Sequence, residues 1–276
     1  MYAELHCISN FSFLRGASHP EELVSQAAAL GYSAIAITDE CTMAGIVKAH
    51  VAAKEAGIKL IVGSEFQLEE QLNIVLLAPN RAAYGQICNL ITIARRRAEK
   101  GEYRLSTEDL DIATDQCLAI WIPGSPRQHH SDKHAAWGKR LSKIFEHRLW
   151  LGLEVFPDGQ SVGCYEHVFS LAKTLGLPMV AAGDVHMHDN DRKPLLDVIS
   201  AVRMRQSIQL AGRLLFANRE KYLRPITLIQ QLYPHALLEA STHIAELCQF
   251  SLTNSAMNIP KNWCHRDCHL GNTLGN

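Results

Sequence analysis

The first 190 residues alternate between short apolar runs and helical patterns, and this alternation limits the chain to a few architectures. Apolar runs of strand length occupy residues 2–9, 33–38, 59–63, 73–78, 117–122, 149–156 and 179–182. Amphipathic segments of helical period occupy residues 18–30, 42–56, 81–100, 133–147 and 166–175. Strands that are apolar throughout and alternate with helices predict a parallel sheet covered on both faces. Such a sheet closes into a barrel or forms a wide doubly wound sheet.

The first helix carries its own boundary signals. Ser18 is expected to cap it, Pro20 fits its first turn, and Glu21 completes a capping box. Gly31 then ends the helix, because glycine adopts the left-handed backbone that terminates helices.

Length and composition exclude several classes of protein. The chain has 276 residues, is 47% hydrophobic and has a formal net charge of −1. It can therefore bury a full core and is neither disordered nor strongly basic, which argues against a dedicated nucleic-acid binder. The sequence contains neither an apolar run of membrane-spanning length nor a secretory leader at its start. Because the eight cysteines are scattered, we expect reduced thiols, a cytoplasmic location and no membrane partner.

Polar side chains capable of binding metal follow the predicted strands at the points where they end. They are His6, Asp39, Glu65, Glu154, Asp184 and His186. In a barrel of parallel strands these ends converge on one face, whereas in an open sheet only a few would, so the pattern favours the barrel. Asp184 and His186 are two residues apart on an extended segment and should point to the same side. Imidazole and carboxylate together suit a divalent metal such as Zn²⁺ or Mn²⁺.

Four segments, in this order, resemble motifs of a known family. Residues 2–18, 36–40, 63–65 and 182–188 are similar to motifs of the polymerase and histidinol phosphatase (PHP) domain of bacterial C-family DNA polymerases, particularly the error-prone branch. The resemblance implies an α/β fold, a distorted (β/α)₇ TIM-like barrel with a C-terminal helical extension. It also implies a barrel at residues 1–190, a helical extension at 191–252, and a divergent tail at 253–276.

The match to the family's metal ligands is incomplete. Ile8 stands where the family has the second histidine of its opening motif, Arg15 where it has an aspartate, and Glu40 where it has a histidine. Asn73 occupies a further position that is often histidine. The candidate metal ligands that remain are His6, Asp39, Glu40, Glu65, Asp184 and His186.

The losses change the chemistry expected of the site. Ile8 offers no ligand, and the fixed charge of Arg15 repels a cation. We therefore expect at most one divalent ion (Zn, Mn or Mg). A site without metal, stabilised by an ion pair between Arg15 and a carboxylate, is the alternative.

The resemblance implies a role in DNA replication and damage-tolerant translesion synthesis, as the PHP domain of an error-prone DNA polymerase III alpha-like subunit. Expected partners are the polymerase core or other mutagenic-repair subunits, with DNA contacted indirectly. The family's polymerase site lies in a palm domain that these 276 residues do not include, so no polymerase activity is expected from this chain alone. The alternatives are a stand-alone metal-dependent phosphoesterase or 3′–5′ exonuclease, and a binding module that holds no metal.

An arginine cluster and a motif near the end of the chain lie outside the predicted metal site. Arg95, Arg96 and Arg97 form the strongest basic cluster, which could contact phosphates or an acidic partner, or be a solvated helix end. The tail contains a His-Arg-Asp-x₄-Asn spacing at residues 265–272, but the chain lacks the other kinase motifs, so a kinase is excluded. We expect this tail to be disordered.

Overall fold

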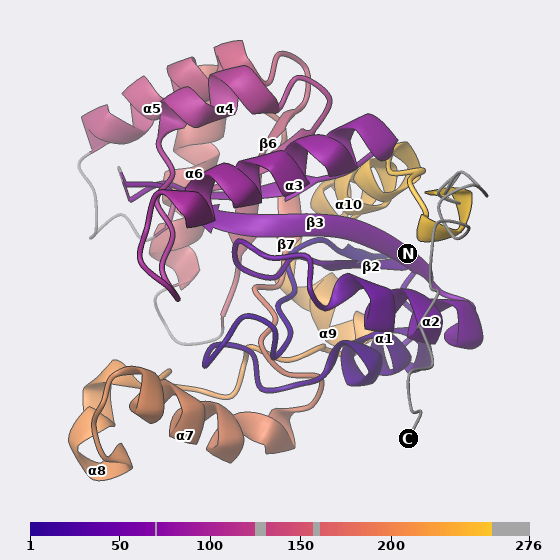
Figure 1. The fold of residues 1–276 in the computed structure, drawn as a ribbon, viewed down its shortest axis with the longest axis vertical. Coiled ribbons are helices and arrows are strands. Elements are labelled where there is room, and N and C mark those ends of the chain that lie inside the picture. Colours follow the sequence, from indigo (N-terminus) through magenta and orange to yellow (C-terminus); the bar gives the residue numbers. More distant parts are fainter. Residues whose placement is uncertain (70, 125–130, 157–160, 256–276) are drawn as a thin grey trace, which may run out of the picture.

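The computed structural model describes residues 1–69, 71–124, 131–156 and 161–255 (Figure 1). Seven strands form one sheet in which each strand pairs with the next one along the chain. They are β1 (Ala3–Glu4), β2 (Ala34–Ile37), β3 (Lys59–Gln67), β4 (Asn73–Leu77), β5 (Leu118–Ile122), β6 (Leu149–Glu154) and β7 (Met179–Ala182). The sheet closes almost completely, because Cys7 and Val185, just beyond β1 and β7, form a parallel bridge. The predicted seven-stranded barrel is confirmed.

The prediction of an all-parallel sheet was wrong at one strand. β4 runs antiparallel to both β3 and β5, while the other pairs are parallel. The reason is the short connection between Gln67 and Asn73, in which Leu68 N donates to Leu72 O at 2.9 Å. A parallel crossover needs a dozen or more residues, so a connection this short returns the chain as a hairpin.

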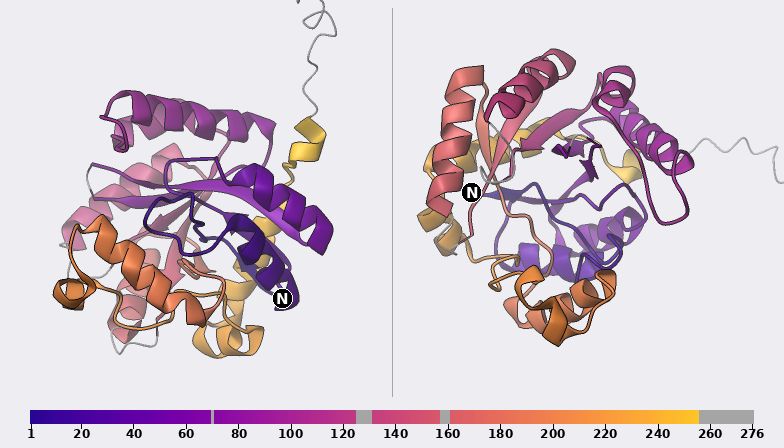
Figure 2. Two further views of the ribbon diagram at one scale, coloured as in Figure 1. Left: turned by 60° about the horizontal axis from the view of Figure 1, so that its bottom comes forward. Right: turned by 90° about the vertical axis from the view of Figure 1, so that its left-hand side faces the viewer.

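Helices surround the strands on the outside of the barrel (Figure 2). They are α1 (Pro20–Ala29), α2 (Ile46–Ala56), α3 (Arg81–Arg96), α4 (Thr107–Ala113), α5 (Ser131–Ile144) and α6 (Ser161–Leu175). The core consequently has two layers. In β2, for example, Ala34 and Ala36 belong to the smaller inner cluster, and Ile35 and Ile37 to the larger cluster shared with the helices. The inner cluster combines these alanines with larger side chains such as Ile61, Ile120 and Trp150, which together fill the interior of a narrow barrel.

The segment after β7 contributes to both ends of the barrel. It contains η1 (Asn190–Arg192), α7 (Lys193–Arg203), α8 (Ile208–Ala211), η2 (Gly212–Leu214), α9 (Ile226–Leu232), α10 (His235–Leu247) and η3 (Leu252–Ser255). α10 closes the amino end, where Ile244, Ala245 and Cys248 complete the inner cluster. The backbone NH of Ala3 donates to Ser241 Oγ at 3.2 Å, which fastens this helix to β1. The carboxyl end is left open for polar side chains.

The predicted start of the first helix differs from the observed one by one residue. The first helix is capped at His19 and not at Ser18, and Glu22 rather than Glu21 completes the capping box. Ser18 instead bonds His188, with its Oγ accepting from the His188 backbone NH at 2.8 Å. Among the described residues, no helix is both long and apolar enough to cross a bilayer. The expected disorder of the tail concerns residues that lie almost entirely outside the described part of the chain.

Candidate metal centre

Five of the six predicted strand-end residues lie together at the carboxyl end of the barrel, and Asp39 is the exception. His6 follows β1, Glu65 lies in β3, and Glu154 is the last residue of β6. The His6 ring lies between these two carboxylates, with Nδ1 2.7 Å from Glu154 Oε1 and Nε2 3.1 Å from Glu65 Oε2. Burial lowers the pKa of His6, but the two carboxylates outweigh burial and raise it to about 9. Without a metal, this imidazole is therefore held as a cation at neutral pH.

Three residues have the spacing of a metal-binding group. Ligand atoms of His6, Glu154 and Asp184 all lie within 4.8 Å of one another. The sequence marks Glu154 as a polar strand end, but Glu154 is not among the six predicted metal ligands. Its position at the end of an apolar strand was the signal that could have identified it.

Asp184 and His186 are neighbours, as their spacing predicted. His186 Nε2 lies 2.8 Å from Asp184 Oδ1, and its Nδ1 lies 3.2 Å from the Arg15 carbonyl. Asp184 adopts a left-handed backbone (φ +45°), which turns the chain as it leaves β7. Burial, together with the charge of Arg15, lowers the pKa of His186 to about 3. This ring is therefore neutral at neutral pH.

Arg15 occupies the centre of the site. Its guanidinium lies 2.7 Å from Glu40 Oε2 and 3.1 Å from Glu65 Oε1, and its side chain is only 16% exposed. Burial raises the pKa of Glu65, but the Arg15 and His6 cations outweigh burial and hold it well below its usual range. The ion pair expected between Arg15 and a carboxylate is therefore present, and it uses two candidate ligands, Glu40 and Glu65.

A second cation, Lys221, was not foreseen. Its ammonium pairs with Asp184 and lies 5.0 Å from the ring centre of Phe156 and 4.6 Å from that of Phe216. Burial lowers the pKa of Lys221 to about 8, against the opposing effect of Glu154. No strand, motif or periodic pattern precedes Lys221 in the sequence, so nothing there marked it as a site residue.

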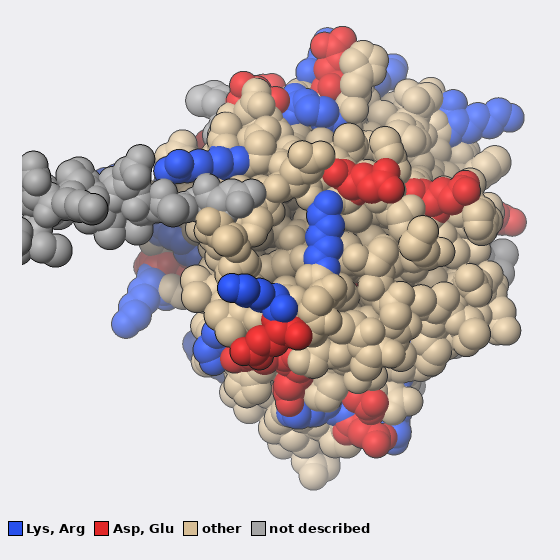
Figure 3. Space-filling model, turned by 90° about the vertical axis from the view of Figure 1, so that its right-hand side faces the viewer, with Lys and Arg blue, Asp and Glu red and all other residues tan. Residues whose placement is uncertain are grey.

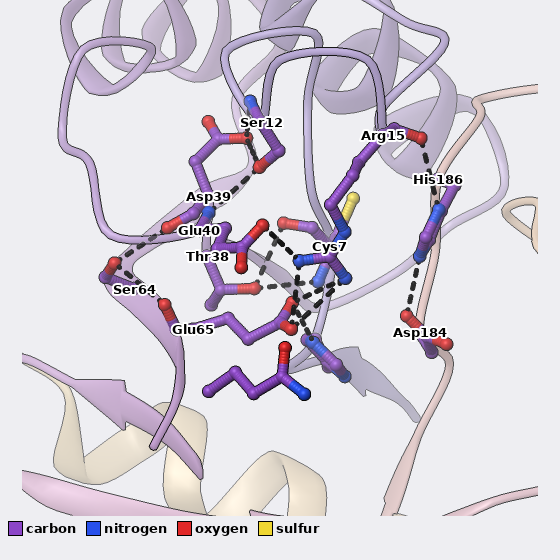
Figure 4. A network of polar contacts seen from close by, with 12 residues as sticks. Cys7, Ser12, Arg15, Thr38, Asp39, Glu40, Ser64, Glu65, Asp184 and His186 are labelled. Atoms are coloured by element: carbon purple, nitrogen blue, oxygen red, sulfur yellow. Dashed lines mark hydrogen bonds and ion pairs between the residues drawn. The ribbon is translucent and has the colours of Figure 1, made fainter. Parts of the chain in front are cut away.

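Asp39 lies apart from the other predicted ligands. Its carboxylate accepts hydrogen bonds from the backbone NH groups of Ser9 and Ser12 at 2.7 and 3.1 Å, and from both hydroxyls at 2.7 Å. Figure 4 shows it turned toward Ser12 and away from Glu65. Burial raises the pKa of this carboxyl, although the four hydrogen bonds oppose that effect. In this arrangement Asp39 organises the loop that carries Arg15.

Glu4 fixes the backbone that carries the site residues. Its Oε1 accepts hydrogen bonds from the backbone NH groups of Leu5, His6 and Gly183 at 2.9–3.0 Å, and Tyr2 donates to Oε2 at 2.9 Å. A Cβ at Gly183 would lie 2.2 Å from Glu4 Oε2, so only glycine fits there. This carboxylate therefore joins the ends of β1 and β7, which carry His6 and Asp184.

A cavity of about 530 Å³ opens beside the site. Arg15, Glu65, His186 and Lys221 line it together with residues of α7 and η2. Asn73, at the position that is often histidine in the family, also lines it, and its buried Oδ1 has no hydrogen-bond partner. One amide oxygen thus remains available to a ligand.

The arginine cluster is divided between internal and external roles. Arg95 donates to the carbonyls of Glu40 and Cys41 at 3.2–3.4 Å, so it fixes the loop that carries Glu40. Arg97 pairs with Asp109 at 2.7 Å. Arg96 is exposed, and it is the member of the cluster best placed to meet a phosphate or an acidic partner.

The balance of charges limits the number of metal ions that these residues can hold. Four carboxylates (Glu40, Glu65, Glu154 and Asp184) face two fixed cations, Arg15 and Lys221. With His6 protonated, three cations face these four carboxylates, so a divalent ion at His6, Glu154 and Asp184 would have to displace the proton of His6. The four carboxylates do not balance a cluster of two or three ions that share bridging carboxylates. The donor set fits a single ion and does not fit a multinuclear centre.

Fold and site together define a class. The family model of the PHP domain matches residues 4–151, and the chain belongs to this family. Over 261 residues it is 49% identical to the error-prone DNA polymerase of Methylococcus capsulatus, covering 94% of this chain and 24% of that protein. It is 48% identical over 260 residues to the error-prone DNA polymerase of Pseudomonas fluorescens, covering 94% of this chain and 25% of that protein. The chain thus spans about a quarter of the length of these relatives, and the resemblance read from the sequence is confirmed.

Solved structures resemble the chain more distantly. A proposed metal-dependent phosphoesterase from Bifidobacterium adolescentis aligns with a TM-score of 0.48 and 19% identity, covering 67% of this chain and 87% of that one.

Proposed function

We propose that the chain serves as the PHP domain of an error-prone DNA polymerase and that its old metal site now works as an ion-paired structural centre. Its role is to support the polymerase core during damage-tolerant synthesis, as part of an assembly in the cytoplasm. The observation that carries this proposal is the Arg15 guanidinium, which pairs with Glu40 and Glu65 in the middle of the site.

Hydrolysis of a phosphoester by paired metals needs carboxylates that are free to bridge two ions. Here Glu65 and Glu40 are held by Arg15, and Asp184 is held by Lys221. A single Zn²⁺, Mn²⁺ or Mg²⁺ ion at His6, Glu154 and Asp184 would supply charge neutralisation and one Lewis-acid centre. Support of the polymerase core therefore requires no metal-catalysed reaction, and any ion bound here has a structural role.

The surface supports a role in contact with the rest of a polymerase. Apolar side chains are exposed along α7, α8 and η2 and at Phe216, at the open end of the barrel: Leu195, Val198, Val202, Ile208, Leu210, Leu214 and Phe216. Figure 3 shows a different face, on which acidic and basic side chains of the described residues are interspersed without a broad basic area. We assign the apolar face to contact with the polymerase core. Because the chain has a net charge of −1, we assign DNA contact to that core as well.

Metal content and hydrolysis together test the proposal. Protein purified without chelator should contain less than one ion per chain, measured by inductively coupled plasma mass spectrometry. It should not release phosphate from an aryl phosphate, or nucleotides from a single-stranded DNA 3′ end, with Mn²⁺ or Zn²⁺ added. Hydrolysis that disappears in both His6→Ala and Glu154→Gln would overturn the proposal in favour of the alternative, a metal-dependent phosphoesterase or exonuclease. The spacing of His6, Glu154 and Asp184 is the observation that favours that alternative.

A further inference from the structure

Lys221 is delivered to the site by backbone pairing. The NH groups of His186 and Met187 donate to the Lys221 carbonyl at 2.9 and 3.1 Å, and Met187 forms a parallel bridge with Tyr222. This short extra segment lies beside the residues that follow β7. The position of the Lys221 Cα is therefore fixed by the same chain segment that carries Asp184 and His186.

The surroundings of the ammonium group suit a cation that belongs to the protein. The side chain is 13% exposed, and the ammonium pairs with Asp184 Oδ2 and lies over the rings of Phe156 and Phe216. Aromatic faces attract a monovalent ammonium through the ring quadrupole. They offer no oxygen to a hard divalent ion, which prefers carboxylates, carbonyls and water. This part of the site is built for an ammonium.

The same carboxylate belongs to the group that could bind metal. Asp184 pairs with Lys221 and also lies within 4.8 Å of ligand atoms of His6 and Glu154. A divalent ion bound there would lie close to a buried ammonium, and the two cations would repel each other strongly at short range. Lys221 and a metal ion therefore compete for one cluster of negative charge.

We propose that Lys221 is a tethered cation that takes the place of a divalent ion at Asp184, Glu154 and His6, so that the chain neutralises its own carboxylates. This inference rests on the proposed function and deepens it. It explains how a barrel with family ligands at its strand ends keeps that end folded when the ligand set has decayed. It also predicts that removing the charge of Lys221 alone restores metal binding at this site.

Replacing Lys221 with methionine tests the proposal, because methionine keeps the length of the stem and removes the charge. Lys221→Met should melt at a lower temperature than the wild type in EDTA, and added Zn²⁺ or Mn²⁺ should restore the midpoint. Its affinity for Zn²⁺, measured by calorimetry, should exceed that of the wild type by at least tenfold. The wild-type midpoint should be the same with EDTA and with metal.

Two further variants control this experiment. Lys193→Met removes an ammonium paired with Asp197 on α7, 2.6 Å away, and should show no metal-dependent midpoint. Lys221→Met combined with Asp184→Asn should lose the rescue by metal, because the shared carboxylate is gone. A rescue that survives in the double variant, or a wild type that binds Zn²⁺ as tightly as Lys221→Met, would overturn the proposal.

A variant that does not depend on Lys221→Met being soluble completes the test. Asp184→Asn in the otherwise wild-type chain leaves the buried ammonium without its carboxylate and should lower the midpoint equally in EDTA and in Zn²⁺. An unchanged midpoint would show that the pair contributes nothing and would overturn the inference. Hydrolysis by the wild type would instead contradict the proposed function, so the two failures can be told apart.

Discussion

The guanidinium of Arg15 donates to both carboxylate oxygens of Glu65, at 3.1–3.4 Å, and both side chains are largely buried. The resemblance to the family implies an aspartate at the first of these positions, so Arg15 places a positive charge where a carboxylate is expected. The pair occupies the site's centre, and its removal should have a large effect.

Arg15→Met should destabilise the protein by about 3–5 kcal/mol, because it leaves Glu65 and Glu40 buried without a cation. Urea unfolding followed by circular dichroism measures this loss. Arg97→Met is the matched control, since its pair with Asp109 is half exposed on the arginine side and should contribute at most about 1 kcal/mol. Equal losses in the two variants would show that the Arg15 pairs are no stronger than a surface pair.

The His6 imidazolium should make stability depend on pH on the alkaline side. The carboxylates on its two nitrogens raise the folded-state pKa to about 9, above the value of 6.5 for a free histidine. The stabilisation is therefore complete below about pH 6.5 and is lost as the pH rises through 9. The gap in unfolding free energy between wild type and His6→Asn should shrink over this range, by up to about 3 kcal/mol. A constant gap from pH 6 to 9.5 would contradict the assignment.

The sequence was sufficient for the barrel but only for part of the site. Apolar runs such as residues 118–122 show their burial directly, and polar residues at their ends showed where the site would form. The direction of β4 depended on the shortness of one connection, which hydrophobic periodicity does not report. The sequence does not identify Lys221 as a site residue either. A lysine in a loop belongs to no periodic pattern, and only the folded chain brings it beside Asp184.

Asp39 shows a different limit. Its neighbour Glu40 reaches the site, whereas Asp39 turns back toward Ser9 and Ser12. Adjacent residues after a strand point in different directions, so a motif alone cannot say which of the two carboxylates faces a metal. Contacts with the serines decided this.

Gly183→Ala should be strongly destabilising although it adds only one methyl group. The new Cβ would meet Glu4 Oε2 at 2.2 Å, and Glu4 cannot move without losing hydrogen bonds to three backbone NH groups. We expect a loss of about 2–4 kcal/mol in unfolding free energy. Gly85→Ala, in a helix with nothing within 4 Å of its Cβ, is the control and should stabilise the protein by about 0.5–1 kcal/mol.

The Gly183 effect should depend on Glu4. In a Glu4→Ala background the carboxylate is absent, and adding Gly183→Ala should cost at least about 1 kcal/mol less than it does in the wild type. A double-mutant cycle measured by urea unfolding gives this difference. Additive losses would mean that the strain comes not from Glu4 but from another neighbour, such as Val185, whose Cγ2 would lie 3.0 Å from the new Cβ.

Asp39→Asn should separate a structural carboxylate from a metal ligand. The amide keeps one acceptor but presents an NH₂ group to hydroxyls and NH groups that now all donate to the carboxylate. Stability should fall by about 2–3 kcal/mol, because buried donors lose a charged acceptor. The stoichiometry of Zn²⁺ bound by Lys221→Met should be the same with and without Asp39→Asn, since the ion is held by His6, Glu154 and Asp184. If Asp39→Asn abolishes Zn²⁺ binding in a chain that is still folded at the assay temperature, then Asp39 is a metal ligand.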